Sequence, residues 1–455
     1  MKGEAYDEAK EPRIISTLSP DLKLAYSRYT YTMSDYISSG KFPWYAFGKP
    51  PKGIAQRVAE ICRYARVILE TDFSRMDGRI NNLLRTLEKM IYLAMFHPAH
   101  HPELIALMEK QYKQKGVTRL HVKYDTGDSR LSGSPETSVN NTLVNAFHSY
   151  LTSRLRGQPS NDAWDNLQEW GIYGGDDGLV ANSDASMAVK AAEMIGLKLK
   201  ANVKTRGDHY VSFLARIYSQ DVWNGNPSSC CDIRRQLLKI HLTPRLPPGV
   251  DAITKLREKC RGFIMTDKNT PVIGDLAIVV LQVYGIPKTD HGLMSYFSDY
   301  PEHEQYPNEN MQKWMDWLVK DQIPTFDMKA FGKWLLAVSK GEADPLSSPL
   351  FSSFEEDPPK APTVPLKING DLVLPQKEKE EAEPEQKEVK KKAAPTKVCN
   401  SIAKGEPCKF GDKCIFLHPE RKPSEAGGVC RDFNKAEGCK RAKCKFKHVA
   451  QKAVL

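Results

Sequence analysis

The stretch "YGGDDGLV", Tyr173 to Val180, places two adjacent aspartates between glycines and flanks them with short apolar runs. The runs "GIY" and "GLVANS" have the length of short strands, so the segment is predicted to form a β-hairpin. Aspartate and glycine are ordinary turn residues, and one interpretation is a turn with no further role. The alternative is that the turn holds carboxylates where a divalent metal ion binds them.

The overall composition suits a soluble globular protein. The chain has 455 residues, of which 40% are hydrophobic and 27% charged, and this length allows two or three domains. No apolar run approaches the roughly 18 residues that cross a bilayer, and the N-terminal sequence lacks the apolar segment of a signal peptide. We therefore expect a cytosolic protein without a transmembrane segment, and peripheral attachment to membranes stays open.

Composition divides the chain into three parts. Residues 1–345 have a mixed composition in which helical and strand-like stretches alternate. Residues 346–397 are rich in Pro, Glu and Lys, cannot bury a core, and are predicted to form a disordered linker. Residues 398–449 are rich in cysteine. The last 59 residues carry 14 Lys and Arg against six Asp and Glu, which suggests a polyanionic partner such as nucleic acid.

Apolar periodicity predicts several elements in the first part. One strand pair is expected at 210–218, with helices at 79–96, 137–155, 185–197, 251–261, 274–285, 309–320 and 328–339.

The cysteine-rich part contains two similar ligand sets. Three cysteines and one histidine recur in the spacings C-x8-C-x5-C-x3-H and C-x8-C-x4-C-x3-H. Three thiolates and one imidazole complete the tetrahedral shell of a structural zinc ion, and metal binding would supply the folding energy of units this small. The predicted ligands of the two Zn²⁺ ions are Cys399, Cys408, Cys414 and His418, and Cys430, Cys439, Cys444 and His448.

This pattern resembles the CCCH zinc-finger family, whose members commonly bind single-stranded RNA. Phe410, Phe416, Phe433 and Phe446 stand among lysines and arginines. Such rings can stack on bases while the cations hold phosphates. The alternative, that some of the rings only pack on the zinc sites, stays open.

Acidic and polar motifs surround the aspartate pair in a particular order. "EPRIIS", "DFSRMDG", "SGSPETSVNN", "YGGDDG" and "FLAR" follow one another along the chain. This order resembles the palm motifs of viral RNA-dependent RNA polymerases, most closely the noda-like lineage. The resemblance implies an α+β right-hand fold: a palm with an antiparallel sheet and helices, a helical thumb reaching about residue 345, and truncated fingers. It also implies the host-cell cytoplasm, and attachment to replication membranes stays open.

The resemblance assigns the catalytic residues. Asp72 and Asp176 would bind two Mg²⁺ (or Mn²⁺) ions, with Asp177 peripheral, so that the metals stabilise charge on the attacking and leaving oxygens. Lys204 matches the lysine that acts as general acid for pyrophosphate, and the alternative is a solvated lysine. The remaining matched residues hold the nucleotide or the primer. They are Lys10 and Arg13 for the triphosphate, Asp77, Thr137 and Asn141 for the ribose hydroxyls, Ser132 and Gly133 in a mobile loop, and Arg216 at the primer grip.

The predicted activity is template-directed transfer from NTPs to an RNA 3′ end, with template RNA, nascent RNA and NTPs as partners. Only nine residues precede Lys10, whereas members of the resembled family have much of their fingers before that motif. We therefore expect a fragment or a chain that another chain completes. The main alternative is a non-enzymatic zinc-finger RNA-binding protein with an incomplete polymerase-like domain. A reverse transcriptase is disfavoured by Asp77 and Asn141, which suit a 2′-hydroxyl, and a cellular CCCH regulator would not explain the palm motifs.

Overall fold

The fold is described from a computed structural model. Two units divide the chain, Met1–Lys360 and Ala361–Leu455. Lys10, Arg13 and all the predicted zinc ligands lie outside the described residues, so those predictions stay untested. The described residues are 14–118, 121–243, 246, 248–287, 311–348, 366–368, 371–373, 401 and 404.

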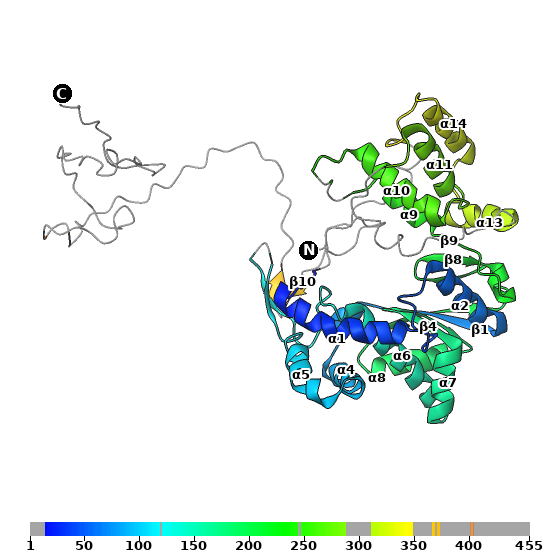
Figure 1. Ribbon diagram of the computed structural model, residues 1–455. Helices are drawn as coiled ribbons and strands as arrows, with labels where there is room; N and C mark the ends of the chain where they lie inside the picture. Colours follow the sequence, from blue (N-terminus) through cyan, green and yellow to red (C-terminus); the bar gives the residue numbers. More distant parts are fainter. Residues whose placement is uncertain are drawn as a thin grey trace, which may run out of the picture. The chain divides into compact units, whose positions relative to one another are not determined.

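A four-stranded antiparallel sheet lies at the centre of the first unit (Figure 1). Its strand order is β4 (Gly171–Gly174), β5 (Asp177–Ala181), β1 (Val67–Phe73) and β6 (Leu199–Thr205). Each neighbouring pair is antiparallel, with β1 between β5 and β6. The predicted hairpin around the aspartates is therefore confirmed, as are the α+β class and the antiparallel sheet.

Helices cover both faces of this sheet because β1 carries apolar side chains on both. Leu69 and Phe73 point to one face and pack with α6 (Thr137–Leu155) and α8 (Ala185–Met194). Ile68 points to the other face and packs with α2 (Pro51–Tyr64). The alternation follows the two-residue period of a strand, and burial on both faces makes β1 the centre of the core.

A second group of helices lies beside the sheet. Predicted helix 79–96 is interrupted, because the Asn81 side chain accepts the Leu84 N–H and starts a new helix. A buried cluster rich in aromatic side chains packs the helix Pro20–Ser38, through Tyr26, against the helix Asn82–Met95, through Tyr92. The elements of this group are α1 (Pro20–Ser38), α3 (Met76–Arg79), α4 (Asn82–Met95), η1 (Pro98–His100), α5 (His101–Glu109), β2 (Lys115–Val117), β3 (Lys123–Asp125) and α7 (Ser160–Trp170).

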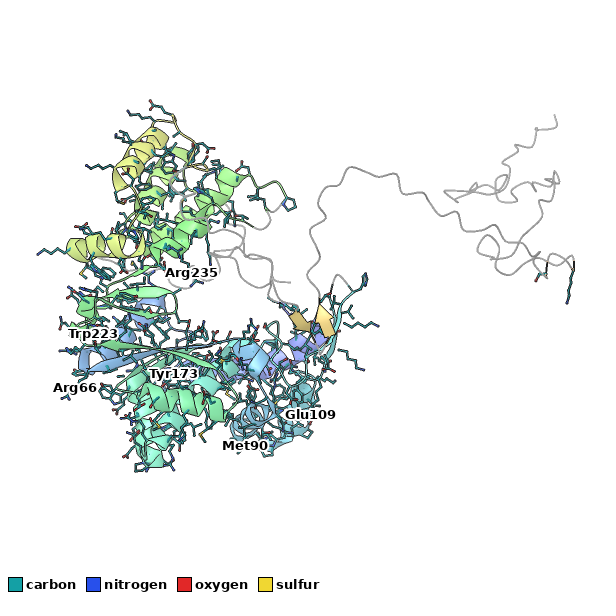
Figure 2. All side chains as sticks on the ribbon, turned by 180° about the vertical axis from the view of Figure 1, so that it is seen from behind. Arg66, Met90, Glu109, Tyr173, Trp223 and Arg235 are labelled. Atoms are coloured by element: carbon teal, nitrogen blue, oxygen red, sulfur yellow. The ribbon has the colours of Figure 1, made fainter. Side chains whose placement is uncertain are left out.

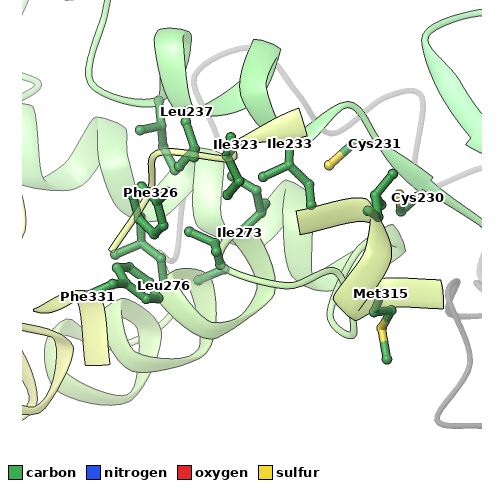
Figure 3. Close-up of a cluster of buried hydrophobic side chains, with 14 of the residues drawn as sticks. Cys230, Cys231, Ile233, Leu237, Ile273, Leu276, Met315, Ile323, Phe326 and Phe331 are labelled. Carbon is green, nitrogen blue, oxygen red and sulfur yellow. The ribbon is translucent and has the colours of Figure 1, made fainter. Parts of the chain in front are cut away.

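A three-stranded antiparallel sheet and a helical region follow. The sheet has the order β7 (Tyr210–Phe213), β8 (Arg216–Ser219) and β9 (Ser229–Cys231), with η2 (Gln220–Asn224) between the last two strands. The helical region comprises α9 (Ile233–Ile240), α10 (Ala252–Thr266), α11 (Ile273–Tyr284), α13 (Gln312–Gln322) and α14 (Met328–Ser339). Its buried side chains, among them Ile233, Leu276 and Phe331, form one cluster with Cys230 and Cys231 (Figure 3). The strand pair and the helices predicted here are confirmed, whereas their identity as a thumb stays a prediction.

Two short strands lie within the predicted linker 346–397, and the prediction that this segment as a whole is disordered stays untested. Strands β10 (Leu366–Ile368) and β11 (Asp371–Val373) pair antiparallel inside the segment expected to be disordered. The two residues between them in the sequence are Asn-Gly, a strong local signal for a hairpin that the Pro- and Glu-rich composition obscured. Every helix within the described residues is too short or too polar to cross a lipid bilayer.

Candidate active site

The aspartate pair lies at a two-residue turn between β4 and β5. Gly174 and Asp177 are partners across the hairpin, so Gly175 and Asp176 form the loop. Gly175 has a φ of +68° and Asp176 has no positive φ, which is the pattern of a type II′ turn with glycine first. Tyr173, which lies on β4 next to the turn and is labelled in Figure 2, is fully buried. The backbone of this turn is that of a common hairpin turn. Its special features are its contacts with α6 and β1.

Helix α6 fixes this turn through two buried polar side chains. Thr142 Oγ1 accepts the backbone N–H of Gly175 at 2.8 Å. Asn145 Nδ2 donates to the carbonyls of Gly175 and Asp177 at 3.1 and 3.0 Å. The sequence analysis missed both residues, although their signal was present: polar residues recur every three or four positions along this helix.

Gly178 is required for the close approach of β5, β1 and α6. A Cβ atom at this position would overlap Thr71 Oγ1 and lie 3.2 Å from Asn145 Oδ1. The Thr71 hydroxyl is itself buried between these elements. The glycine that follows the aspartates therefore serves packing, not turn geometry.

The two strands bring the carboxylates predicted to be catalytic together. Asp72 on β1 is the direct partner of Asp177 on β5. Burial, reinforced by the negative charges of Asp176 and Asp72, raises the pKa of Asp177 to about 7. No group of three or more His, Cys, Asp or Glu in the described parts of the chain is already arranged as a metal site. Even so, the carboxylates of Asp72, Asp176 and Asp177 repel one another, and their oxygens are the ligands that a hard divalent cation prefers.

The strand register puts Lys200 beside Asp72. Lys200 is the partner of Asp72 across β1 and β6, and its Nζ lies 3.4 Å from Asp72 Oδ2. Lys204 pairs instead with Ile68, and its ammonium lies 3.7 Å from the centroid of the Tyr210 ring. The structure therefore places a different lysine next to the carboxylates than the one expected, and the proton-donor role of Lys204 stays a prediction.

A second cluster forms around Asp77 on α3. Ser132 Oγ donates to Asp77 Oδ2 at 2.5 Å, and Asn141 Nδ2 donates to Asp77 Oδ1 at 2.8 Å. Three residues that the sequence analysis assigned to nucleotide binding are thus brought together. Both oxygens of the Asp77 carboxylate are held, so the group presents a fixed acceptor.

The loop before α6 is braced by its neighbours. Thr137 Oγ1 lies 2.9 Å from the Ser134 carbonyl, to which it donates. Gly133 donates its N–H to the Ser16 carbonyl at 3.0 Å, and a Cβ at Gly133 would lie 2.8 Å from the same oxygen. The predicted roles of Thr137 and Gly133 are not tested by these contacts, which show that the two residues shape the loop.

Arg216 lines a cavity next to Asp177. The cavity has a volume of about 450 Å³ and is lined by residues of β5, β7, β8 and the helical region, including Asp177, Tyr210 and Arg216. The Arg216 guanidinium is engaged elsewhere, with Nη1 at 2.8 Å from Asp267 Oδ2 and Nε at 3.1 Å from Ser229 Oγ. The pair with Asp267 holds the guanidinium charge and raises the pKa of Arg216. Arg216 therefore ties β8 to β9 and to the end of α10, and thereby shapes the cavity wall.

Comparison with known proteins agrees with the class indicated by the site. Residues 13–237 match the family described as viral RNA-dependent RNA polymerase. The RNA-directed RNA polymerase of Pariacoto virus is 33% identical over 287 residues, which are 63% of this chain and 29% of that protein. The RNA-directed RNA polymerase of Greasy grouper nervous necrosis virus is 36% identical over 277 residues, which are 60% of this chain and 27% of that protein. The chain thus spans less than a third of the length of these relatives.

A solved structure is similar in fold. It is the crystal structure of the insertion loop deletion mutant of the RNA-dependent RNA polymerase of a human picorbirnavirus, with a TM-score of 0.51 and 16% identity. The similarity covers 73% of this chain and 61% of that one. At this identity the similarity concerns the fold alone.

Proposed function

We propose that this chain catalyses template-directed transfer of nucleoside monophosphates from NTPs to the 3′ end of a growing RNA in viral replication. The observation that carries the proposal is the facing pair Asp72 and Asp177, with Asp176 at the tip of a turn that α6 holds rigidly. The similarity of residues 13–237 to viral RNA-dependent RNA polymerases supports it.

The carboxylates suit the metals that this reaction needs. Asp72 and Asp176 would bind two Mg²⁺ or Mn²⁺ ions, with Asp177 peripheral, and the bound ions would stabilise charge on the attacking and leaving oxygens. The chain's own residues orient these ligands: Asn145 and Thr142 fix the hairpin backbone, and the β1–β5 pairing aligns Asp72 with it. Preorganisation of this kind lowers the barrier because nothing has to be rearranged during the reaction.

Other residues would bind the substrates. Asp77 and Asn141 would recognise the ribose hydroxyls of the NTP, which agrees with their direct hydrogen bond and with the bond from Ser132. The remaining assignments follow the sequence motifs. They are Lys10 and Arg13 for the triphosphate, Thr137 for the ribose, Gly133 for the mobile loop, Lys204 for proton donation, and Arg216 for the primer grip.

The cysteine-rich tail would add an RNA-binding function. Two CCCH sets would each bind one Zn²⁺ ion, and their basic and aromatic residues suit single-stranded RNA. A flexible tether would raise the local concentration of RNA near the catalytic residues. Native mass spectrometry of the chain should therefore show two zinc ions, with one lost in Cys414→Ser. RNA affinity that is unchanged after zinc removal would contradict this role.

The test of the catalytic proposal is primer extension on an RNA template in the presence of Mg²⁺. We expect the intact chain to add nucleotides and Asp176→Ala to add none. Asp162→Ala is the matched control, because Asp162 is an exposed aspartate on α7 outside the site, and this variant should keep wild-type activity. Another chain would supply the missing fingers if the zinc-loaded wild-type chain adds no nucleotides alone. If it still adds none with that upstream chain present, the proposal that this chain catalyses the reaction is wrong, and the non-enzymatic RNA-binding alternative stands.

A further inference from the structure

A buried charge network lies behind the Asp77 cluster. It consists of two arginines and two glutamates: two of the four lie on α4, one in the loop between β3 and α6, and one directly before α6. Each is no more than 7% exposed: Arg85, Glu88, Arg130 and Glu136. Two positive and two negative charges balance, which is the condition under which burial of ionised groups is tolerated. The sequence analysis did not find this network.

Short contacts connect the four groups. Arg85 Nη1 lies 2.6 Å from Glu136 Oε1 and 3.2 Å from Glu88 Oε2. Arg130 Nη1 lies 3.0 Å from Glu136 Oε1, and Arg130 Nη2 also contacts Glu88 Oε1. Burial alone would raise the pKa of Glu136, but Arg130 and Arg85 hold it below its usual value. Each arginine is therefore held in place by both glutamates.

Arg130 alone among the four also contacts the Asp77 cluster. Its Nε donates to Asn141 Oδ1 at 2.6 Å, and its backbone N–H donates to the Asp77 carbonyl at 2.8 Å. Asn141 therefore directs its oxygen to Arg130 and its NH₂ group to Asp77. A flipped amide would bring NH₂ against the guanidinium and oxygen against the carboxylate, so that both contacts become repulsive. The network thus fixes which way the Asn141 amide points.

We propose that Arg130 is a positioning residue for recognition of the ribose 2′-hydroxyl by Asp77 and Asn141. The inference rests on the proposed function, since it concerns the same nucleotide site. A site built to hydrogen-bond a substrate hydroxyl rejects the analogue that lacks it, because its buried polar groups are then left unsatisfied. That rejection requires donors and acceptors with fixed directions. Without the Arg130 bond the Asn141 amide can rotate, and the site becomes tolerant of a 2′-deoxyribose.

Arg130→Lys tests this directly. Lysine keeps the positive charge near Glu88 and Glu136, but a single ammonium cannot also reach Asn141 as the planar guanidinium does. Arg85→Lys is the matched control, because Arg85 has the same two glutamate partners and no contact with Asn141. The measured quantity is the kcat/KM ratio of ATP to 2′-dATP on a poly(U) template. Because the ratio is taken within one sample, loss of folded protein cancels.

We expect Arg130→Lys to lower this ratio by about tenfold, the equivalent of one hydrogen bond, and Arg85→Lys to leave it unchanged. Equal ratios in the wild type and Arg130→Lys, or an equal fall in both variants, would overturn the inference. If Arg130→Lys does not fold, the charge-balanced pair Arg130→Met with Glu88→Gln replaces it. Its control is then Arg85→Met with Glu88→Gln.

A second measurement separates this inference from the proposed activity. Absence of primer extension by the wild-type chain would refute the activity and leave the nucleotide site to be tested by binding. Isothermal titration with a non-hydrolysable ATP analogue and its 2′-deoxy counterpart then gives the preference for ribose. A preference in the wild type that Arg130→Lys reduces and Arg85→Lys retains supports the inference, whereas a preference unaffected by Arg130→Lys overturns it.

Discussion

Substitution of Thr142 tests how the catalytic hairpin is held. Thr142 and Thr152 are both buried in α6, and each hydroxyl donates to the carbonyl four residues earlier, at 2.7 and 2.9 Å. Only Thr142 also accepts a hydrogen bond from Gly175. Thr→Val conserves side-chain volume at both positions. The difference between the two variants therefore isolates the contact with the hairpin.

The expected magnitudes follow from the hydrogen bonds that are lost. Thr152→Val loses one side-chain bond and should cost about 0.5–1.5 kcal/mol. Thr142→Val loses the equivalent bond and also leaves the buried Gly175 N–H unsatisfied, which adds about 1–3 kcal/mol. In a domain of this size that addition lowers the thermal midpoint by roughly 2–6 °C more than in the control.

Two assays on the intact chain measure this difference. Calorimetry gives the two midpoints, and primer extension well below both midpoints gives the rate of nucleotide addition by folded enzyme. Thr142→Val should be slower because Asp176 and Asp177 lie on the loosened turn, and Thr152→Val should resemble the wild type. Equal midpoints for the two variants, or a wild-type rate for Thr142→Val, would refute the reasoning.

Two further predictions concern the packing around the hairpin and its acid sensitivity. Gly178→Ala should destabilise the chain by about 1–3 kcal/mol, because its Cβ would overlap Thr71 Oγ1. Its control, Gly262→Ala, has open space around the new Cβ in α10 and should stabilise the chain by about 0.5–1 kcal/mol. Equal midpoints of urea unfolding for the two variants would contradict this. Burial lowers the pKa of His148 from 6.5 to about 4, so the unfolded chain takes up a proton that the folded chain refuses as the pH falls between these values. Between pH 7 and pH 4.5 the free energy of unfolding of the wild type should thus fall by about 2–3 kcal/mol more than that of His148→Gln. Urea unfolding of both proteins at both pH values measures this, and an equal fall in the two would contradict the prediction.

Local patterns explain what the sequence predicted well. The turn of glycines and aspartates, the ordered motifs and the long helix 137–155 depend on residues close together in the chain, and the structure has the hairpin and the helix where they were expected. The alternation of apolar residues likewise predicted the strand pair of β7 and β8. Asp77, Ser132 and Asn141 were singled out from motifs alone, and they meet in the fold.

Long-range pairing explains what the sequence did not predict. Whether Lys200 or Lys204 faces Asp72 depends on the register of β1 and β6, which spacing alone does not fix. Arg130 and Glu88 come from separate segments, and nothing in either segment identifies them as a buried pair. Composition gave no sign of strands β10 and β11, which pair within the polar segment 346–397.

The central claim is that Asp72, Asp176 and Asp177 support nucleotide addition directed by an RNA template. The most direct measurement uses four primed RNA templates that differ only in the first templating base, each offered the four NTPs singly with Mg²⁺. The account predicts that the wild-type chain adds only the complementary nucleotide on each template and that Asp72→Asn adds none. Nucleotide addition that ignores the templating base, or that persists in Asp72→Asn, would contradict it.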